Sequence, residues 1–105
     1  MMSLTSQHRR MLRGIGHHLE PVVMVGDDGL SEGVLAETER ALGDHELIKI
    51  RLPAGDRDAR GALIDALCEA TGAEAIQTIG RVAVLFRAAP RPDPRKSNVL
   101  RHQRG

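Results

Sequence analysis

The sequence Gly26-Asp27-Asp28-Gly29 is the part of this chain whose residue types point most directly to a binding chemistry. Glycine reaches positive φ without steric cost and lets another backbone come close. The N–H groups at the start of a following helix suit an anion such as phosphate. A GxxG turn also occurs for purely structural reasons where a strand leads into a helix. An anion-binding loop and an ordinary turn are therefore both open interpretations.

The two residues between the glycines complicate phosphate binding, because the carboxylates of Asp27 and Asp28 repel a second negative charge. Backbone N–H groups of Gly29 and Leu30 could bind phosphate at some electrostatic cost. Alternatively, the loop contacts sugar, bases or a cation instead of phosphate. If the loop binds a nucleic acid, it does so in one of these ways.

Basic residues at three places in the chain are candidates for contacts with a phosphate backbone. Arg9, Arg10 and Arg13 stand at i, i+1 and i+4 and predict a positive patch on a first helix. Lys49 lies on the less apolar face of a predicted strand, and Arg81 lies in a predicted turn. Each could reach a phosphate without reading base sequence. The alternative for all of them is a solvated surface position.

Other chemistries find little support in the residue types. The histidines have no H-x-x-x-H spacing, and a single cysteine cannot complete a zinc site, so no metal site or cofactor is expected. Cys68 falls on the apolar stripe of a predicted helix and is expected to be a core residue. No phosphate loop of the Gly-Lys-Ser or Gly-Lys-Thr kind is present, so neither catalysis nor a small-molecule substrate is expected.

Charge is distributed unevenly along the 105 residues, although the net charge is only +1. Residues 1–18 carry +3 and residues 88–105 carry +4, whereas residues 19–87 carry −6. A nucleic-acid contact requires only a locally positive face, so this pattern permits RNA or DNA binding. The basic tail could instead cover the acidic body or maintain solubility. No apolar run approaches the roughly 18 residues of a membrane span, and a cytoplasmic protein is expected.

Aromatic residues are almost absent, with one Phe and no Tyr or Trp. RRM and OB domains stack unpaired bases on aromatic side chains, and this chain lacks such platforms. Any recognition of nucleic acid is therefore expected to depend on backbone, shape and charge.

Hydrophobic periodicity predicts the elements that must position these residues. A helix capped by Thr5 or Ser6 precedes the apolar strand 22–25, which is expected to be central and buried on both faces. Helices starting after Ser31 and Asp56 alternate with strands, in the order α-β-α-β-α-β-β. The remaining strands are predicted at residues 46–52, 75–79 and 82–86, the last two joined by a tight turn. One α/β domain over residues 1–88 with a mixed four-stranded sheet follows, with residues 89–105 as a basic, disordered tail.

Several segments together resemble a known family. They are Leu19 to Leu30 with the sequence LEPVVMVGDDGL, Gly33-Val34, His45 to Ile50 with the sequence HELIKI, Thr71-Gly72 and Ile79-Gly80-Arg81. Over residues 4–88 the chain resembles the bacterial YhbY family, the stand-alone form of the CRM domain. The resemblance implies an RNA-binding domain similar in fold to the C-terminal domain of translation initiation factor 3. Members are associated with precursors of the large ribosomal subunit, and the family's GxxG loop matches Gly26 to Gly29.

From these observations and the resemblance we expect a monomeric RNA-binding protein without catalytic activity. Its expected partner is structured ribosomal RNA in the pre-50S particle, and its expected role is to assist large-subunit assembly. The alternative is a protein-interaction module that binds a basic ribosomal protein through its acidic middle.

Overall fold

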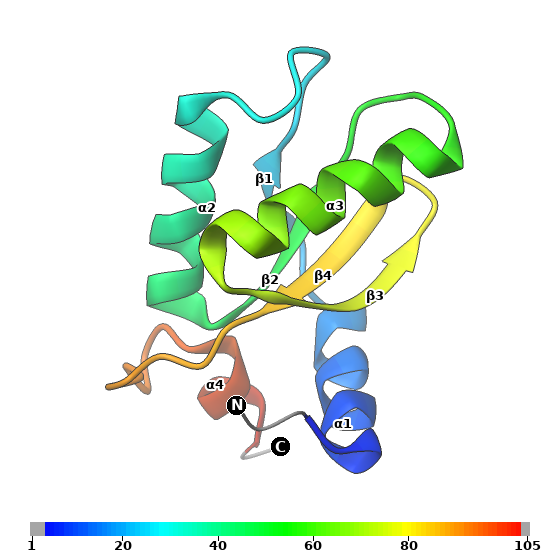
Figure 1. The fold of residues 1–105 in the computed structure, drawn as a ribbon. Helices are drawn as coiled ribbons and strands as arrows, with labels where there is room; N and C mark the ends of the chain where they lie inside the picture. The colour runs from blue at the N-terminus through cyan, green and yellow to red at the C-terminus, as the bar shows by residue number, and fades with distance from the viewer. Residues whose placement is uncertain (1–3, 104–105) are drawn as a thin grey trace.

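The computed structural model describes residues 4–103. Its elements, in chain order, are α1 (Ser6–His17), β1 (Pro21–Met24), α2 (Glu32–His45), β2 (Leu47–Arg51), α3 (Arg57–Thr71), β3 (Glu74–Ile79), β4 (Val82–Phe86) and α4 (Asn98–Gln103). The strands form one sheet in the order β1-β2-β4-β3 (Figure 1). β1 is parallel to β2, and the other two pairs are antiparallel. The predicted α/β class and mixed four-stranded sheet are confirmed, and the predicted element order holds from α1 to β4, with α4 as an additional helix.

Two apolar clusters on opposite faces of the sheet hold the helices in place. The cluster under α2 and α3 includes Val23, Val25, Leu42, Ile48, Ile50, Leu52, Ile64, Leu67, Ala83 and Leu85. The cluster under α1 and α4 includes Leu12, Ile15, Leu47, Ile76, Val84, Phe86 and Val99. The domain therefore has three layers, with α2 and α3 on one side of the sheet and α1 and α4 on the other (Figure 1). Charged residues on the same side of the sheet therefore share one solvent-exposed surface.

The first three helices begin where the sequence predicts. Thr5, Ser31 and Asp56 each accept a hydrogen bond at the side chain from the N–H group three residues further on. Such a cap satisfies one of the unpaired N–H groups of the first turn. Gly72 ends α3 with φ +76°, the left-handed conformation that glycine adopts without strain.

β1 differs from its prediction, because it is an edge strand and not a central one. Only one face of it is covered. Val23 is fully buried under α2 and α3, whereas Val22 is 45% exposed and Met24 is 57% exposed. An unbroken apolar run predicted cover on both faces, and α1 does not extend far enough to supply it.

The C-terminal segment also differs from its prediction as a disordered tail. Residues 98–103 form α4, and Val99 is buried beside α1 and the sheet. Ahead of α4, Ser97 is fully buried and donates a hydrogen bond to the buried carboxylate of Glu46. Prolines and charges predicted disorder, but these contacts with residues far away in the sequence hold the segment against the body.

Candidate nucleic-acid interface

The three arginines of α1 lie in different surroundings. Arg9 is tied to the sheet, since its Nη2 lies 3.1 Å from Oε2 of Glu74 and its Nη1 donates to the carbonyl of Ala75 at 3.3 Å. Arg10 is exposed and Arg13 is half-buried, and neither pairs with a carboxylate within residues 4–103. Arg10 and Arg13 are therefore free to meet a phosphate, whereas Arg9 orients the helix on β3.

Lys49 lies on the α1 side of the sheet, as the alternation of residues 47–52 predicts. The strand register places it in one row with Pro21, Val84 and Gln77. α1 ends above this row. A Cβ on Gly16 would lie 2.9 Å from Val84 Cγ1, so the helix comes this close only because residue 16 is glycine.

The next row of the sheet lies beyond the end of α1. It contains one residue from each strand, namely Met24, Arg51, Val82 and Ile79, and we call it the open row. Arg51 was not among the predicted contact residues. The same alternation that placed Lys49 on this face could have identified Arg51, because the two residues are two positions apart on one strand.

The GxxG loop is a tight turn. The N–H of Gly29 donates to the carbonyl of Gly26 at 3.0 Å, and Gly29 has φ +71°. In this conformation the Gly29 N–H already has an acceptor, so the geometry does not favour its binding phosphate, which was one of the two interpretations of the loop. Asp27 and Asp28 are both exposed at the tip, without an ion pair among the described residues. The tip is acidic and open to solvent.

Arg81 lies in the hairpin turn between β3 and β4, beside the segment that follows β2. Its Nε donates to the carbonyl of Leu52 at 3.2 Å, and its own carbonyl accepts from the Leu52 N–H at 2.7 Å. The side chain is exposed despite this contact. The strand register shows that β1 and β2 run toward the same end of the sheet as this turn, so the GxxG loop and the β3–β4 turn follow from the same end of the sheet.

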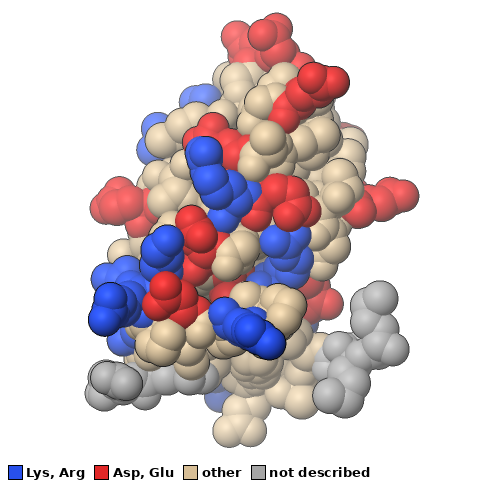
Figure 2. Space-filling model, turned by 90° about the vertical axis from the view of Figure 1, so that its left-hand side faces the viewer, with Lys and Arg blue, Asp and Glu red and all other residues tan. Residues whose placement is uncertain are grey.

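The sheet separates the charges of the domain into two layers. α1 and α4 contain no acidic residue, and the outer face of β2 adds Lys49 and Arg51 beside them. Half of the 14 acidic residues lie on α2 and α3, at Glu32, Glu37, Glu39, Asp44, Asp58, Asp65 and Glu69. Figure 2 shows the side of the molecule formed by α2, where acidic and basic side chains are intermingled. Among residues 4–103, α1 and α4 are helices without acidic side chains, and the layer that they form is therefore the more positive of the two.

Part of the basic C-terminal segment lies against the acidic layer. Nζ of Lys96 is 4.0 Å from Oδ1 of Asp44, and both side chains are about half-exposed. The carbonyl of Lys96 is 2.8 Å from Nδ1 of His45, at the end of α2. This segment therefore partly covers the acidic body.

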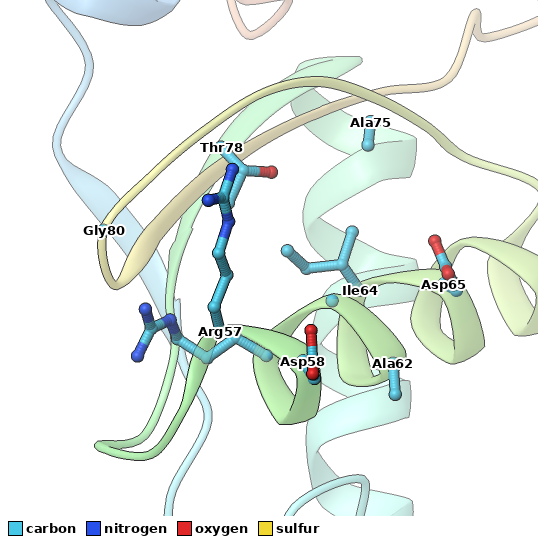
Figure 3. Close-up of a pocket in the computed structure, with 10 residues that line it drawn as sticks. Arg57, Asp58, Ala62, Ile64, Asp65, Ala75, Thr78 and Gly80 are labelled. Carbon is cyan, nitrogen blue, oxygen red and sulfur yellow. The ribbon is translucent and has the colours of Figure 1, made fainter.

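A wide hollow of about 810 Å³ opens between α3 and β3. Figure 3 shows Asp58 and Asp65 along the helix and Thr78 on the strand facing it. Two arginines of the first turn of α3, Arg57 and Arg60, complete the polar lining. Charges of both signs alternate here, so the hollow does not favour a polyanion, and it contains none of the predicted contact residues.

Cys68 is half-buried on α3, as its place on the apolar stripe predicts. Burial raises the pKa of its thiol, and the carboxylates of Asp65 and Glu74 raise it further. A raised pKa disfavours the thiolate that a nucleophile requires. Within residues 4–103, no group of three or more His, Cys, Asp or Glu side chains is placed to hold a metal ion. No helix in that range is long and apolar enough to cross a membrane.

Comparison with known proteins adds to this geometry. The sequence profile of the CRS1 / YhbY (CRM) domain matches residues 4–87. The "Probable RNA-binding protein PA4753" of Pseudomonas aeruginosa is 48% identical, over 95% of this chain and 96% of the relative. An "RNA-binding protein" of Haemophilus influenzae is 47% identical, over 83% of this chain and 88% of the relative.

A solved structure has the same fold. It is the solution structure of SAV1595 from Staphylococcus aureus, described as a candidate RNA-binding protein. It matches with a TM-score of 0.76 and 30% identity, and the match covers 87% of this chain and 95% of the other.

Proposed function

We propose that this chain, which belongs to the CRS1 / YhbY (CRM) domain family, acts by binding structured RNA through the basic layer formed by α1 and the outer face of the sheet. Its relatives of similar length are named RNA-binding proteins, and the CRM domain is an RNA-binding domain. No catalytic step is part of the proposal.

The observation that carries the proposal is the separation of charge across the sheet. Arg10, Arg13, Lys49 and Arg51 face solvent on one layer without a carboxylate partner among residues 4–103. When unpaired cationic side chains neutralise phosphates, counterions condensed on the nucleic acid are released, and this release drives binding. Arg81 and the GxxG loop extend the same surface toward one end of the sheet in this proposal. Contacts of this type position an RNA backbone without reading its sequence.

The finer proposal is that the RNA is ribosomal and that the protein assists assembly of the large subunit as a cytoplasmic monomer. It is supported by the resemblance to the YhbY family, whose members are associated with large-subunit precursors.

The experiment that tests RNA binding is a titration of the intact protein with large-subunit precursor RNA and with an unrelated structured RNA, at several salt concentrations. Affinity that falls linearly with the logarithm of salt supports docking by cations. Tighter binding to the precursor supports the ribosomal assignment. Absence of salt-dependent binding to either RNA contradicts the proposed function.

A second candidate function follows from the acidic layer. The exposed carboxylates of α2 and α3 could attract a basic ribosomal protein, with the basic residues serving only for solubility. In that case, replacing Arg10 and Arg13 with alanine leaves association with pre-ribosomal particles unchanged, whereas replacing the α2 carboxylates weakens it. The first proposal predicts the opposite pattern.

A further inference from the structure

We propose that the open row of the sheet, together with Lys49, takes an unpaired segment of RNA, with bases against its apolar side chains and phosphates beside its cations. This inference rests on the proposed function and adds to it the kind of RNA structure that this part of the surface recognises.

The open row exposes apolar side chains at both of its ends. Met24 on β1 is 57% exposed, and Ile79 on β3 is 64% exposed. Single exposed hydrophobic residues are common, but these two are aligned across one sheet face by the strand register. Three strand spacings separate them, or about 14 Å. Aligned apolar side chains on an uncovered sheet favour a ligand that has flat apolar surfaces of its own.

The end of α1 borders the open row with a small hollow. The hollow measures about 50 Å³ and is lined by Gly16, His17, Lys49, Gln77, Ile79, Val82 and Val84. Lys49 and the exposed side chain of Ile79 both line this hollow, so a cation and an apolar surface lie next to each other there. A hollow of this size admits water-sized groups, so an edge of a base or ribose could enter it, whereas a whole one could not.

Charge decides between RNA and an apolar protein partner as the occupant. Arg51 stands within the open row, between Met24 and Val82, and Lys49 stands in the row beside it. Neither has an ion pair among residues 4–103. A purely apolar partner would have to desolvate both cations without compensation. A nucleic acid supplies phosphates for the cations and bases for the apolar side chains.

An unpaired segment fits this surface better than a duplex does. In an A-form helix the base faces are stacked inside, and only phosphates, sugars and base edges reach a protein. Met24 and Ile79 would then remain in water. Unpaired bases can turn their faces toward the sheet, as they do on aromatic platforms elsewhere. Here aliphatic side chains replace the aromatic ones, so the expected contact is weaker and tolerant of base identity.

The test compares the intact protein on two RNAs of equal length, a hairpin with an unpaired loop and a continuous duplex. We expect the hairpin to bind more tightly at a fixed salt concentration. The variant M24A/I79A should lose about fivefold on the hairpin, which corresponds to roughly 40 Å² of apolar surface no longer buried. Its affinity for the duplex should not change. Both residues are exposed, so the fold is expected to persist, and its thermal midpoint is measured alongside.

A gain-of-function variant and a charge control complete the design. M24F/I79F supplies aromatic faces and should strengthen binding to the hairpin but not to the duplex. R51A should weaken binding to the hairpin, whereas R57A removes an exposed arginine from the other side of the sheet and should have no effect.

The outcomes separate this inference from the function on which it rests. Equal binding to both RNAs, unchanged in every variant of Met24 and Ile79, overturns the inference and leaves RNA docking intact. Binding to neither RNA overturns the proposed function itself. If M24A/I79A binds both RNAs normally but loses association with a protein of the pre-ribosomal particle, the occupant is a protein and the inference fails.

Discussion

The hydroxyl of Ser97 donates a 2.6 Å hydrogen bond to Oε1 of Glu46, and both residues are buried. The other carboxylate oxygen of Glu46 accepts from the N–H of Ala89 at 2.8 Å. One side chain at the end of α2 thus binds both ends of the segment that leads to α4. Glu46 adopts φ +62°, a conformation that non-glycine residues rarely adopt, which places its carboxylate beneath this segment.

Replacing Glu46 with alanine is expected to lower the free energy of unfolding by about 3 kcal/mol, because two hydrogen bonds to a buried charge are lost. The loss should loosen α4 first, since the buried O–H of Ser97 would lose its acceptor, although the Ser97 oxygen would still accept from the Leu100 N–H. Thermal denaturation measures the stability, and hydrogen exchange of residues 98–103 measures the local effect. D44A is the matched control, because the Lys96 contact with Asp44 is at 4.0 Å and exposed. It should change stability by less than about 0.5 kcal/mol. Equal effects of E46A and D44A would contradict this account.

The contact between Glu46 and Ser97 also illustrates what the sequence could not predict. Hydrophobic periodicity, helix caps and the Gly80-Arg81 turn were sufficient for the element order, because each depends on neighbouring residues. The order of residues 89–103 depends instead on a carboxylate 51 positions away from Ser97. Six residues of α4 would not form a stable helix alone, so no local signal marks it.

The edge position of β1 was missed for a related reason. An apolar run indicates burial on both faces only if other elements cover both of them, and Val22 and Met24 remain 45% and 57% exposed. The positions of the cationic residues in the candidate interface could accordingly be predicted from the sequence, whereas the exposure of its apolar residues could not. Lys49 follows from strand alternation, whereas the open row required the register of the whole sheet.

Cys68 leads to a prediction about alkaline pH. Burial raises the pKa of its thiol above the ordinary value of 9.0, and Asp65 and Glu74 raise it further. The folded state therefore favours the neutral thiol, and this contribution to stability is complete below pH 9 and lost as pH rises through the folded pKa. C68A should flatten the decline of stability above pH 9 relative to the parent chain, as measured by denaturant unfolding at several pH values. Parallel pH profiles for the two proteins would contradict the predicted shift.

The arginines of α1 are expected to have two different roles, RNA binding for Arg10 and Arg13 and helix packing for Arg9. R10A/R13A should weaken RNA binding and lower the slope of log affinity against log salt by about one unit for each lost phosphate contact, with little change in stability. R9A should instead lower stability, because Arg9 holds α1 to Glu74 and Ala75. Titrations at several salt concentrations and a thermal melt distinguish the two effects. R40A removes an exposed arginine of α2 and serves as the control. An unchanged slope in R10A/R13A would remove these residues from the interface.

The two glycines of the GxxG loop should differ when each is changed to alanine. Gly29 has φ +71°, so G29A should lower stability by about 1 kcal/mol. Gly26 has no such φ, and a Cβ there would meet nothing within 4 Å, so G26A should leave stability unchanged. If RNA approaches the loop backbone closely, G26A lowers affinity because its methyl group occupies that space. Normal RNA affinity for G26A would show that the loop does not make close backbone contact.

The acidic tip of the same loop gives a prediction with the opposite sign. Asp27 and Asp28 are exposed and unpaired among the described residues, so they repel any phosphate that approaches the turn. If the tip lies near the RNA backbone, D27N/D28N should raise affinity by about fivefold at low salt, and the gain should shrink as salt screens the repulsion. D58N/D65N removes two exposed carboxylates from α3 and is the matched control, with no expected effect. A loss of affinity in D27N/D28N would mean that the carboxylates accept hydrogen bonds from bases or sugars, or bind a bridging cation. The loop would then recognise RNA through its side chains, and the repulsion argument would fail.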